Sequence, residues 1–119
     1  MVSVGVLPEK IDLEIYQGDD FYMTIWVSDP DTGTLVDVDG YSFRSQIRAT
    51  TDSDVILATF EFNIPGALGK VDAHLTGAAT GMLPVGRLVW DFEATNVAGS
   101  GQVMTPCAGV VTVTAQVTR

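Results

Sequence analysis

Paired carboxylates are the side chains of this sequence whose type and spacing could do chemistry. They form three Asp-x-Asp pairs, each at a predicted strand end or loop: Asp29/Asp31, Asp37/Asp39 and Asp52/Asp54. Clustered loop carboxylates can bind Ca²⁺, and two carboxylates at the right separation can cleave glycosides. An EF-hand loop starting at Asp29 would need Glu at its twelfth position, where Gly40 stands. We therefore interpret the pairs as turn residues that bond to their own backbone.

The remaining reactive residue types do not form a catalytic set. The single histidine, His74, lies on the polar face of a predicted strand beside Asp72, which favours an exposed position. The single cysteine, Cys107, can form no internal disulfide and no zinc site by itself, so we predict a buried thiol. Neither a Gly-x-Ser-x-Gly elbow nor a phosphate loop is present. The sequence predicts no catalytic residue, no cofactor and no bound metal, and thus a protein that is not an enzyme.

Composition and charge narrow the class of partner. The chain has 119 residues, 46% of them hydrophobic and 18% charged, with a net charge of −9. Such an acidic protein is repelled by nucleic acid and by anionic membranes, so neither is an expected partner. No basic, apolar leader opens the sequence, and no apolar run approaches the roughly 20 residues of a membrane helix. We expect a soluble protein made in the cytoplasm.

Alternating short segments between turn residues predict an all-β protein. Seven to nine strands at short spacing indicate an antiparallel β-sandwich, with a small barrel as the alternative. Residues 87–94 give the clearest strand, residues 56–62 a single apolar face, and residues 77–83 one short helical turn. The chain should close on a strand running to its last residue. Its predicted inward face comprises Val111, Val113, Ala115 and Val117.

The aromatic residues divide between core and surface. Trp90 alternates with Leu88 and Phe92, which predicts a core position. The strand at residues 20–28 is apolar on both faces, so we expect a central strand that is covered on both sides. Trp26 with Tyr22 could instead form a platform for stacking a sugar. Burial under a neighbouring sheet or subunit is the preferred interpretation, and carbohydrate is the alternative partner.

An N-terminal arm is the segment most suggestive of partner contact. We divide the chain into an arm, residues 1–8, and one β-sandwich domain, residues 9–119. An apolar, β-prone arm could add as a strand to a neighbouring protein, or form the first edge strand of its own domain. The predicted partner-contact residues are Val2, Val4, Val6, Leu7 and Trp26.

Five motifs in a fixed order carry a resemblance to a known family. They are Gln17-Gly-Asp before an aromatic strand ending at Trp26, Val36 to Tyr41 followed by Gln46-Ile-Arg48, Leu75-Thr76 to Leu83, Trp90-Asp91-Phe92, and Gly109 to Arg119. In these motifs the chain resembles small Ig-like β-sandwich modules of tailed-bacteriophage virions. That family includes the N-terminal domain of baseplate upper proteins and related modules of tail-fibre and minor virion proteins.

The resemblance implies an Ig-like sandwich that acts as a non-enzymatic structural protein of a phage particle. It implies docking to other virion proteins as a tail, fibre-associated or connector subunit, in a homo-oligomer or symmetric array. Such a protein is made in the bacterial host cytoplasm and resides in the virion. Such modules usually continue into a fibre or receptor-binding part, whereas this sequence ends at Arg119. Capsid decoration, or a carbohydrate-binding module for host attachment, remains the alternative.

Overall fold

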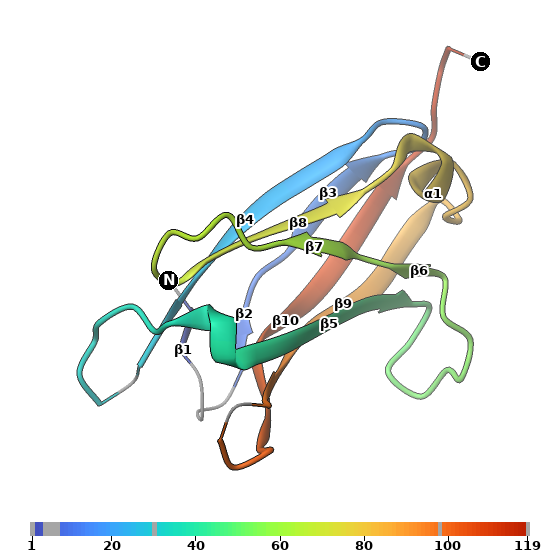
Figure 1. The fold of residues 1–119 in the computed structure, drawn as a ribbon. Helices are drawn as coiled ribbons and strands as arrows, with labels where there is room; N and C mark the ends of the chain where they lie inside the picture. Colours follow the sequence, from blue (N-terminus) through green and yellow to red (C-terminus); the bar gives the residue numbers. More distant parts are fainter. Residues whose placement is uncertain (1, 4–7, 30, 98, 119) are drawn as a thin grey trace.

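Two β-sheets packed face to face form the protein (Figure 1). The computed structural model describes residues 2–3, 8–29, 31–97 and 99–118. The first sheet has the order β1-β4-β8-β7. Its strands are β1 (Val2–Ser3), β4 (Phe21–Ser28), β8 (Lys70–Leu75) and β7 (Glu61–Asn63).

The second sheet has the order β2-β10-β9-β5-β6, and β3 also pairs with β10. Its strands are β2 (Glu9–Lys10), β3 (Leu13–Tyr16), β10 (Val103–Thr114), β9 (Gly86–Asn96), β5 (Tyr41–Arg48) and β6 (Ala58–Thr59). A 3₁₀ turn, η1 (Val38–Gly40), precedes β5, and the short helix α1 (Gly77–Gly81) joins β8 to β9. Strands β2 and β3 run parallel to β10, whereas β9 pairs antiparallel with both β10 and β5.

This arrangement confirms the predicted Ig-like β-sandwich. Strands β1, β4, β8 and β7 occupy the positions of A, B, E and D, while β10, β9 and β5 occupy those of G, F and C. The helical turn expected at residues 77–83 is α1. Its N-cap is Thr76, whose hydroxyl accepts a hydrogen bond from the Ala79 amide at 3.1 Å.

The core lies between the sheets and is built by strand alternation. In β9 every second side chain from Leu88 to Ala94 is buried, so Trp90 and Phe92 are core residues as predicted. The ring centroids of Phe60 and Trp90 lie 6.1 Å apart, and those of Phe62 in β7 and Phe92 in β9 lie 5.7 Å apart. Aromatic contacts from both sheets therefore fill the centre of the sandwich.

Residues 56–62 do not form one continuous strand face, contrary to the prediction. Strand β6 pairs with β5 in the second sheet, whereas β7 pairs with β8 in the first. Phe60 lies at the crossing: its amide still donates to the Ser45 carbonyl of β5 at 2.9 Å, and its ring is buried in the core. The chain passes from one sheet to the other at Phe60 because this buries the Phe60 ring between the two sheets. It also supplies an edge strand to each sheet, β6 to the second and β7 to the first.

The closing strand is also shorter than predicted. β10 ends at Thr114, and Ala115 and Val117 are exposed, Val117 by 83%. The last strand partner of β10 is Tyr16 of β3, paired with Thr114, and beyond this point no neighbouring strand continues among the described residues. The alternation of apolar and polar residues therefore continues in the sequence beyond Thr114, the last residue of β10 that has a strand partner. Within the described part of the chain, no helix is long and apolar enough to cross a membrane.

Cys107 should be unreactive in the folded protein. Its side chain is fully buried in β10, and burial, with smaller contributions from Glu9 and Asp91, raises the pKa of the thiol from 9.0 to about 12. We expect no reaction with a thiol reagent such as DTNB at pH 8 under native conditions, and complete reaction in denaturant.

The same pKa shift gives stability a pH dependence with a definite sign. Because the folded-state pKa lies above the unfolded one, this stabilisation is full below pH 9.0 and is lost as pH rises toward 12. In Cys107→Ala this component of the alkaline loss should be missing, as measured by chemical unfolding at several pH values. Rapid labelling of the wild-type thiol by the reagent under native conditions would contradict the predicted burial of Cys107, on which both expectations depend.

Candidate functional site

The sequence-predicted contact residues are only partly placed by the structure. The backbone of Val2 lies in β1 and pairs in parallel with Val27 of β4, so this part of the arm joins a sheet of its own domain. Val4, Val6 and Leu7 lie outside the described residues. The partner contact proposed for the arm therefore stays a prediction.

Two of the three Asp-x-Asp pairs are turns, as interpreted from the sequence. Asp29 accepts a hydrogen bond from the Asp31 amide at 2.8 Å, and Asp37 accepts one from the Asp39 amide at 3.1 Å. Each carboxylate thus satisfies the backbone of its own turn. In the ranges that the structure describes, no group of three or more His, Cys, Asp or Glu side chains could hold a metal ion.

The outer surface of β4, β8 and β7, which we call the aromatic face, gathers rings and polar groups. Cross-strand pairing sets them in rows, because residues that face each other on neighbouring strands share one side of the sheet. The rows are Tyr22–His74–Glu61, Thr24–Asp72–Asn63 and Trp26–Lys70. The first two rows and Lys70 line a shallow depression of about 460 Å³, and Trp26 stands outside its lining.

The first row forms a flat aromatic platform. Tyr22 is 70% exposed and stacks on the imidazole of His74, with ring centroids 4.4 Å apart and planes only 6° from parallel. Two carboxylates flank that imidazole, with Nδ1 at 3.7 Å from Glu61 Oε2 and Nε2 at 4.0 Å from Asp20 Oδ1. His74 is therefore half-buried rather than plainly exposed, and its imidazole stacks against one face of the Tyr22 ring.

The third row presents a second ring. Trp26 is 40% exposed, and the ammonium group of Lys70 lies 5.9 Å from its ring centroid. Among the described residues no second sheet covers this side of β4, because its outward side chains Tyr22, Thr24 and Trp26 are all exposed. Cover by a neighbouring subunit stays a prediction. Strand β4 is central in its sheet, but only its inner face contributes to the core.

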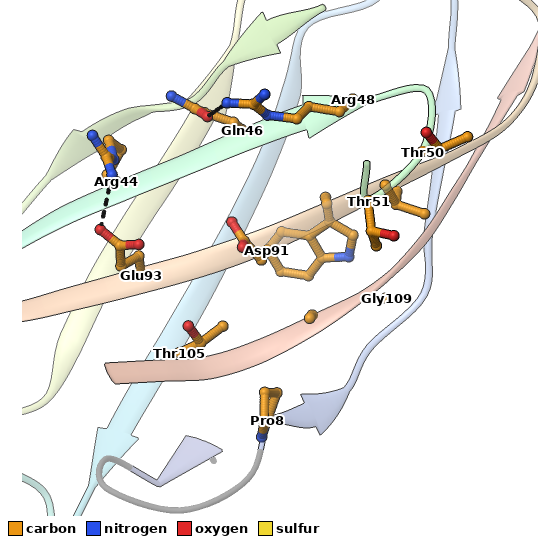
Figure 2. A pocket seen from close by; sticks show the side chains of 13 residues that line it. Pro8, Arg44, Gln46, Arg48, Thr50, Thr51, Asp91, Glu93, Thr105 and Gly109 are labelled. Carbon is orange, nitrogen blue, oxygen red and sulfur yellow. Dashed lines mark hydrogen bonds and ion pairs between the residues drawn. The ribbon is translucent and has the colours of Figure 1, made fainter. Parts of the chain in front are cut away.

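The outer surface of the other sheet carries a second depression, of about 530 Å³ (Figure 2). Its guanidinium groups are already paired. Arg44 forms an ion pair with Glu93 at 3.2 Å, and Arg48 donates to the Ser53 carbonyl at 2.7 Å and to Gln46 at 3.0 Å. Because each cation has protein partners, we assign no ligand to this depression.

Asp91 lies on that surface, on the strand between these arginines and β10 (Figure 2). Burial by its neighbours and then the charge of Glu93 raise its pKa, while Arg44 and Arg48 act in the opposite direction. The desolvated carboxylate therefore costs some stability once it is ionised. Burial and the charge of Glu93 thus account for the raised pKa of Asp91 without a bound ligand.

Three distant segments meet at the end of the sandwich beside α1, and we call this junction the apex. Gln17 bridges two of them, donating to the Leu83 carbonyl at 2.7 Å and accepting from the Gln116 amide at 3.3 Å. The Thr80 hydroxyl is buried, donates to the Asp19 carbonyl at 2.8 Å, and accepts from the Gly18 amide at 3.1 Å. These bonds fix the apex as one rigid unit.

Exposed apolar side chains surround the apex. Met82 is 84% exposed, and Val85 and Val117 are also open to solvent. The Val117 amide donates to the Tyr16 hydroxyl at 2.9 Å, which holds the chain end against the sheet. Figure 1 shows α1 and the C-terminal segment at the same end of the molecule. Such an apolar group on a rigid base is a surface suited to protein contact.

The fold and these surfaces define an Ig-like β-sandwich domain with three distinct outer features. No family model matches the sequence, and no curated protein matches it. Among solved structures, it is similar to the SrpA adhesin R347E mutant from Streptococcus sanguinis, at 15% identity and a TM-score of 0.48. The match covers 87% of this chain and 55% of the adhesin chain. This likeness is too distant to carry an argument about function.

Sequence reasoning missed the partners of Trp26 and Tyr22. Lys70, Asp72 and His74 alternate as the polar side of β8, and this alternation was the available signal. The pairing that sets them opposite the aromatic side chains of β4 joins residues about 50 positions apart. A period of two shows which residues share a face, but it does not show which strands become neighbours.

Proposed function

We propose that this protein is a non-enzymatic structural module of a tailed-phage particle that docks to other virion proteins through its apex. The observation that carries the proposal is the rigid apex with its exposed apolar side chains. Tail, fibre-associated and connector positions all fit a subunit that contacts its neighbours end-on.

The motifs of the phage-module resemblance support this function. Three of them, the Gln17 turn, the segment from Leu75 to Leu83 and the end of the closing segment, are the segments that hydrogen-bond to one another at the apex. Residues that a family shares for structural reasons should lie where they stabilise the fold. Here the motif segments carry or adjoin the exposed apolar residues Met82, Val85 and Val117.

Docking would derive its energy from apolar burial and from repetition. Each Å² of apolar surface removed from water contributes about 25 cal/mol. Three exposed side chains give only modest affinity in a single contact, but a symmetric particle presents many copies of the same contact. A net charge of −9 keeps the free subunits apart, so assembly depends on matching surfaces rather than on general attraction.

The test uses particles produced from the phage or prophage genome that encodes the chain. Particles purified on a density gradient should contain this protein at a constant copy number that is consistent with the symmetry of the particle. In trans-complementation of a deletion, Met82→Ser/Val85→Ser should be incorporated at least ten-fold less than wild type. Incorporation is measured by quantitative mass spectrometry of the purified particles.

The matched control is Val97→Ser/Val103→Ser, which changes two exposed apolar residues at the β9–β10 turn, at the opposite end of the sandwich from α1 (Figure 1). This variant should be incorporated like wild type, and both variants should keep the wild-type unfolding midpoint. Finding the protein in infected cells but not in purified particles would overturn the proposal. Equal incorporation of both variants would remove the apex as the docking surface.

A further inference from the structure

The aromatic face has a chemical character that docking at the apex does not use. It lies on the flank of the sandwich, over β4, β8 and β7, whereas the apex lies at one end. Its exposed residues alternate between rings and hydrogen-bonding groups, with Thr24 and Asp72 between the Tyr22 and Trp26 rows. Their side chains are joined by a hydrogen bond from Thr24 Oγ1 to Asp72 Oδ1 of 2.8 Å.

We propose that the aromatic face binds a neutral oligosaccharide. A pyranose ring has an apolar C–H side, which packs on an aromatic ring, and a rim of hydroxyl groups, which need hydrogen-bond partners. The face offers both kinds of surface side by side. Tyr22 and Trp26 supply the rings, and the carboxylates of Asp72 and Glu61 and the amide of Asn63 supply the polar partners.

The Tyr22 ring is built to receive a flat ligand. Its inner side is occupied by the parallel imidazole of His74, so the phenol has limited freedom to fold inward. A preorganised ring loses little conformational entropy when a ligand stacks on its open side. The imidazole itself is set between the carboxylates of Glu61 and Asp20, at 3.7 Å from Nδ1 and 4.0 Å from Nε2.

The spacing of the two rings sets the size of the ligand. Tyr22 and Trp26 are four residues apart on one strand, which separates them by about 13 Å. One pyranose cannot cover that distance, so the ligand must be a chain of several sugar units. The row of Thr24, Asp72 and Asn63 lies beneath the middle of such a chain.

Charge on the face selects neutral sugars over acidic ones. Asp20, Glu61 and Asp72 place negative charge around the Tyr22 end, which repels uronic and sialic acids. Lys70 is the cation of the Trp26 row, and its ammonium group lies over the indole. On binding, that ammonium group can donate to a sugar hydroxyl while the indole accepts the sugar ring.

The experiment follows the two indole N–H signals by NMR of isotope-labelled, full-length protein. The probes are cellotetraose, mannotetraose, galactotetraose and tetra-N-acetylchitotetraose, with tetragalacturonate as the acidic counterpart. At least one neutral probe should shift the Trp26 signal with a Kd on the order of 0.1–1 mM. The Trp90 indole is the internal control, because it is buried and donates to the Ile11 carbonyl at 2.8 Å.

Variants separate specific binding from chance contact. Tyr22→Ala and Trp26→Ala should each weaken binding at least ten-fold, followed for every variant by the backbone amide signals of β4 and β8 because Trp26→Ala has no Trp26 indole signal. Met82→Ala, at the apex, should leave binding unchanged. Tetragalacturonate should bind at least ten-fold more weakly than the best neutral probe. Unfolding midpoints close to wild type show that each variant is folded.

Three outcomes would overturn the proposal. The first is no shift of the Trp26 signal with any neutral probe up to about 10 mM. The second is binding that survives both aromatic substitutions. The third is a Trp26 signal that moves with protein concentration alone, together with a dimer in light scattering that Tyr22→Ala abolishes; a second copy would then cover the face. None of these results bears on incorporation into particles, so the two proposals fail independently.

Discussion

Replacing Gly109 by alanine is expected to lower the free energy of unfolding by about 3 kcal/mol or more. A Cβ atom at this position would overlap the carbonyl oxygen of Ile11 and lie only 2.9 Å from Asp12 Oδ1. The Ile11–Asp12 segment joins β2 to β3 and runs directly over β10. No side-chain rotation can relieve the overlap, because the atom in the way belongs to the backbone.

Two hydrogen bonds depend on that close approach. The Ile11 carbonyl lies against Gly109 of β10 and accepts the hydrogen bond from Trp90 Nε1 at 2.8 Å. The Asp12 carboxylate accepts a hydrogen bond from the Val110 amide of β10 at 3.0 Å. Moving the segment outward would leave a buried indole N–H without an acceptor, which costs about 1–3 kcal/mol by itself. The rest of the expected loss comes from the displaced strand pairing.

Chemical unfolding followed by tryptophan emission measures this effect. The matched control is Gly81→Ala in α1, where the new Cβ would lie 3.9 Å from Gly18 at ordinary contact distance. This control should be neutral or slightly stabilising, since alanine is the better helix former by about 0.5–1 kcal/mol. If Gly109→Ala costs less than about 1 kcal/mol, the segment at Ile11 has room to move and our account of this crossing is wrong.

Truncating Phe92 to alanine is expected to cost about 3–5 kcal/mol. The side chain is fully buried in β9, and its ring lies 5.2 Å from that of Phe43 in β5 and 5.7 Å from that of Phe62 in β7. It therefore contacts a neighbour in its own sheet and one in the opposite sheet. Its removal would leave a cavity at the centre of the sandwich, which rigid strands on both sides cannot close.

The unfolding midpoint should fall while the denaturant m-value stays near the wild-type value, because the folded surface hardly changes. Tyr22→Ala is the aromatic control: its ring is 70% exposed, and its loss should cost less than about 1 kcal/mol. Similar losses in the two variants would show that the rings of the core contribute no more than a surface stack. That result would contradict the packing described here.

Several features of the fold were predictable from the sequence because local physics determines them. Alternation from Leu88 to Ala94 predicts the buried side of β9, and that side faces the core. The turns at Asp29 and Asp37 follow from a short side chain that bonds to its own backbone. Burial of Cys107 follows from its apolar character and its place in a strand. Each of these inferences needs only a few consecutive residues.

The surfaces on which both proposals depend were decided by the tertiary structure. Tyr22 meets His74, and Gln17 meets Leu83 and Gln116, only because strands and loops far apart in sequence become neighbours. The exposure of Val117 and the change of sheet at Phe60 likewise depend on where neighbouring strands begin and end. Residue alternation determines which side of a strand is apolar. Strand order determines what, if anything, covers that side, because pairing is settled by the combined packing of both sheets.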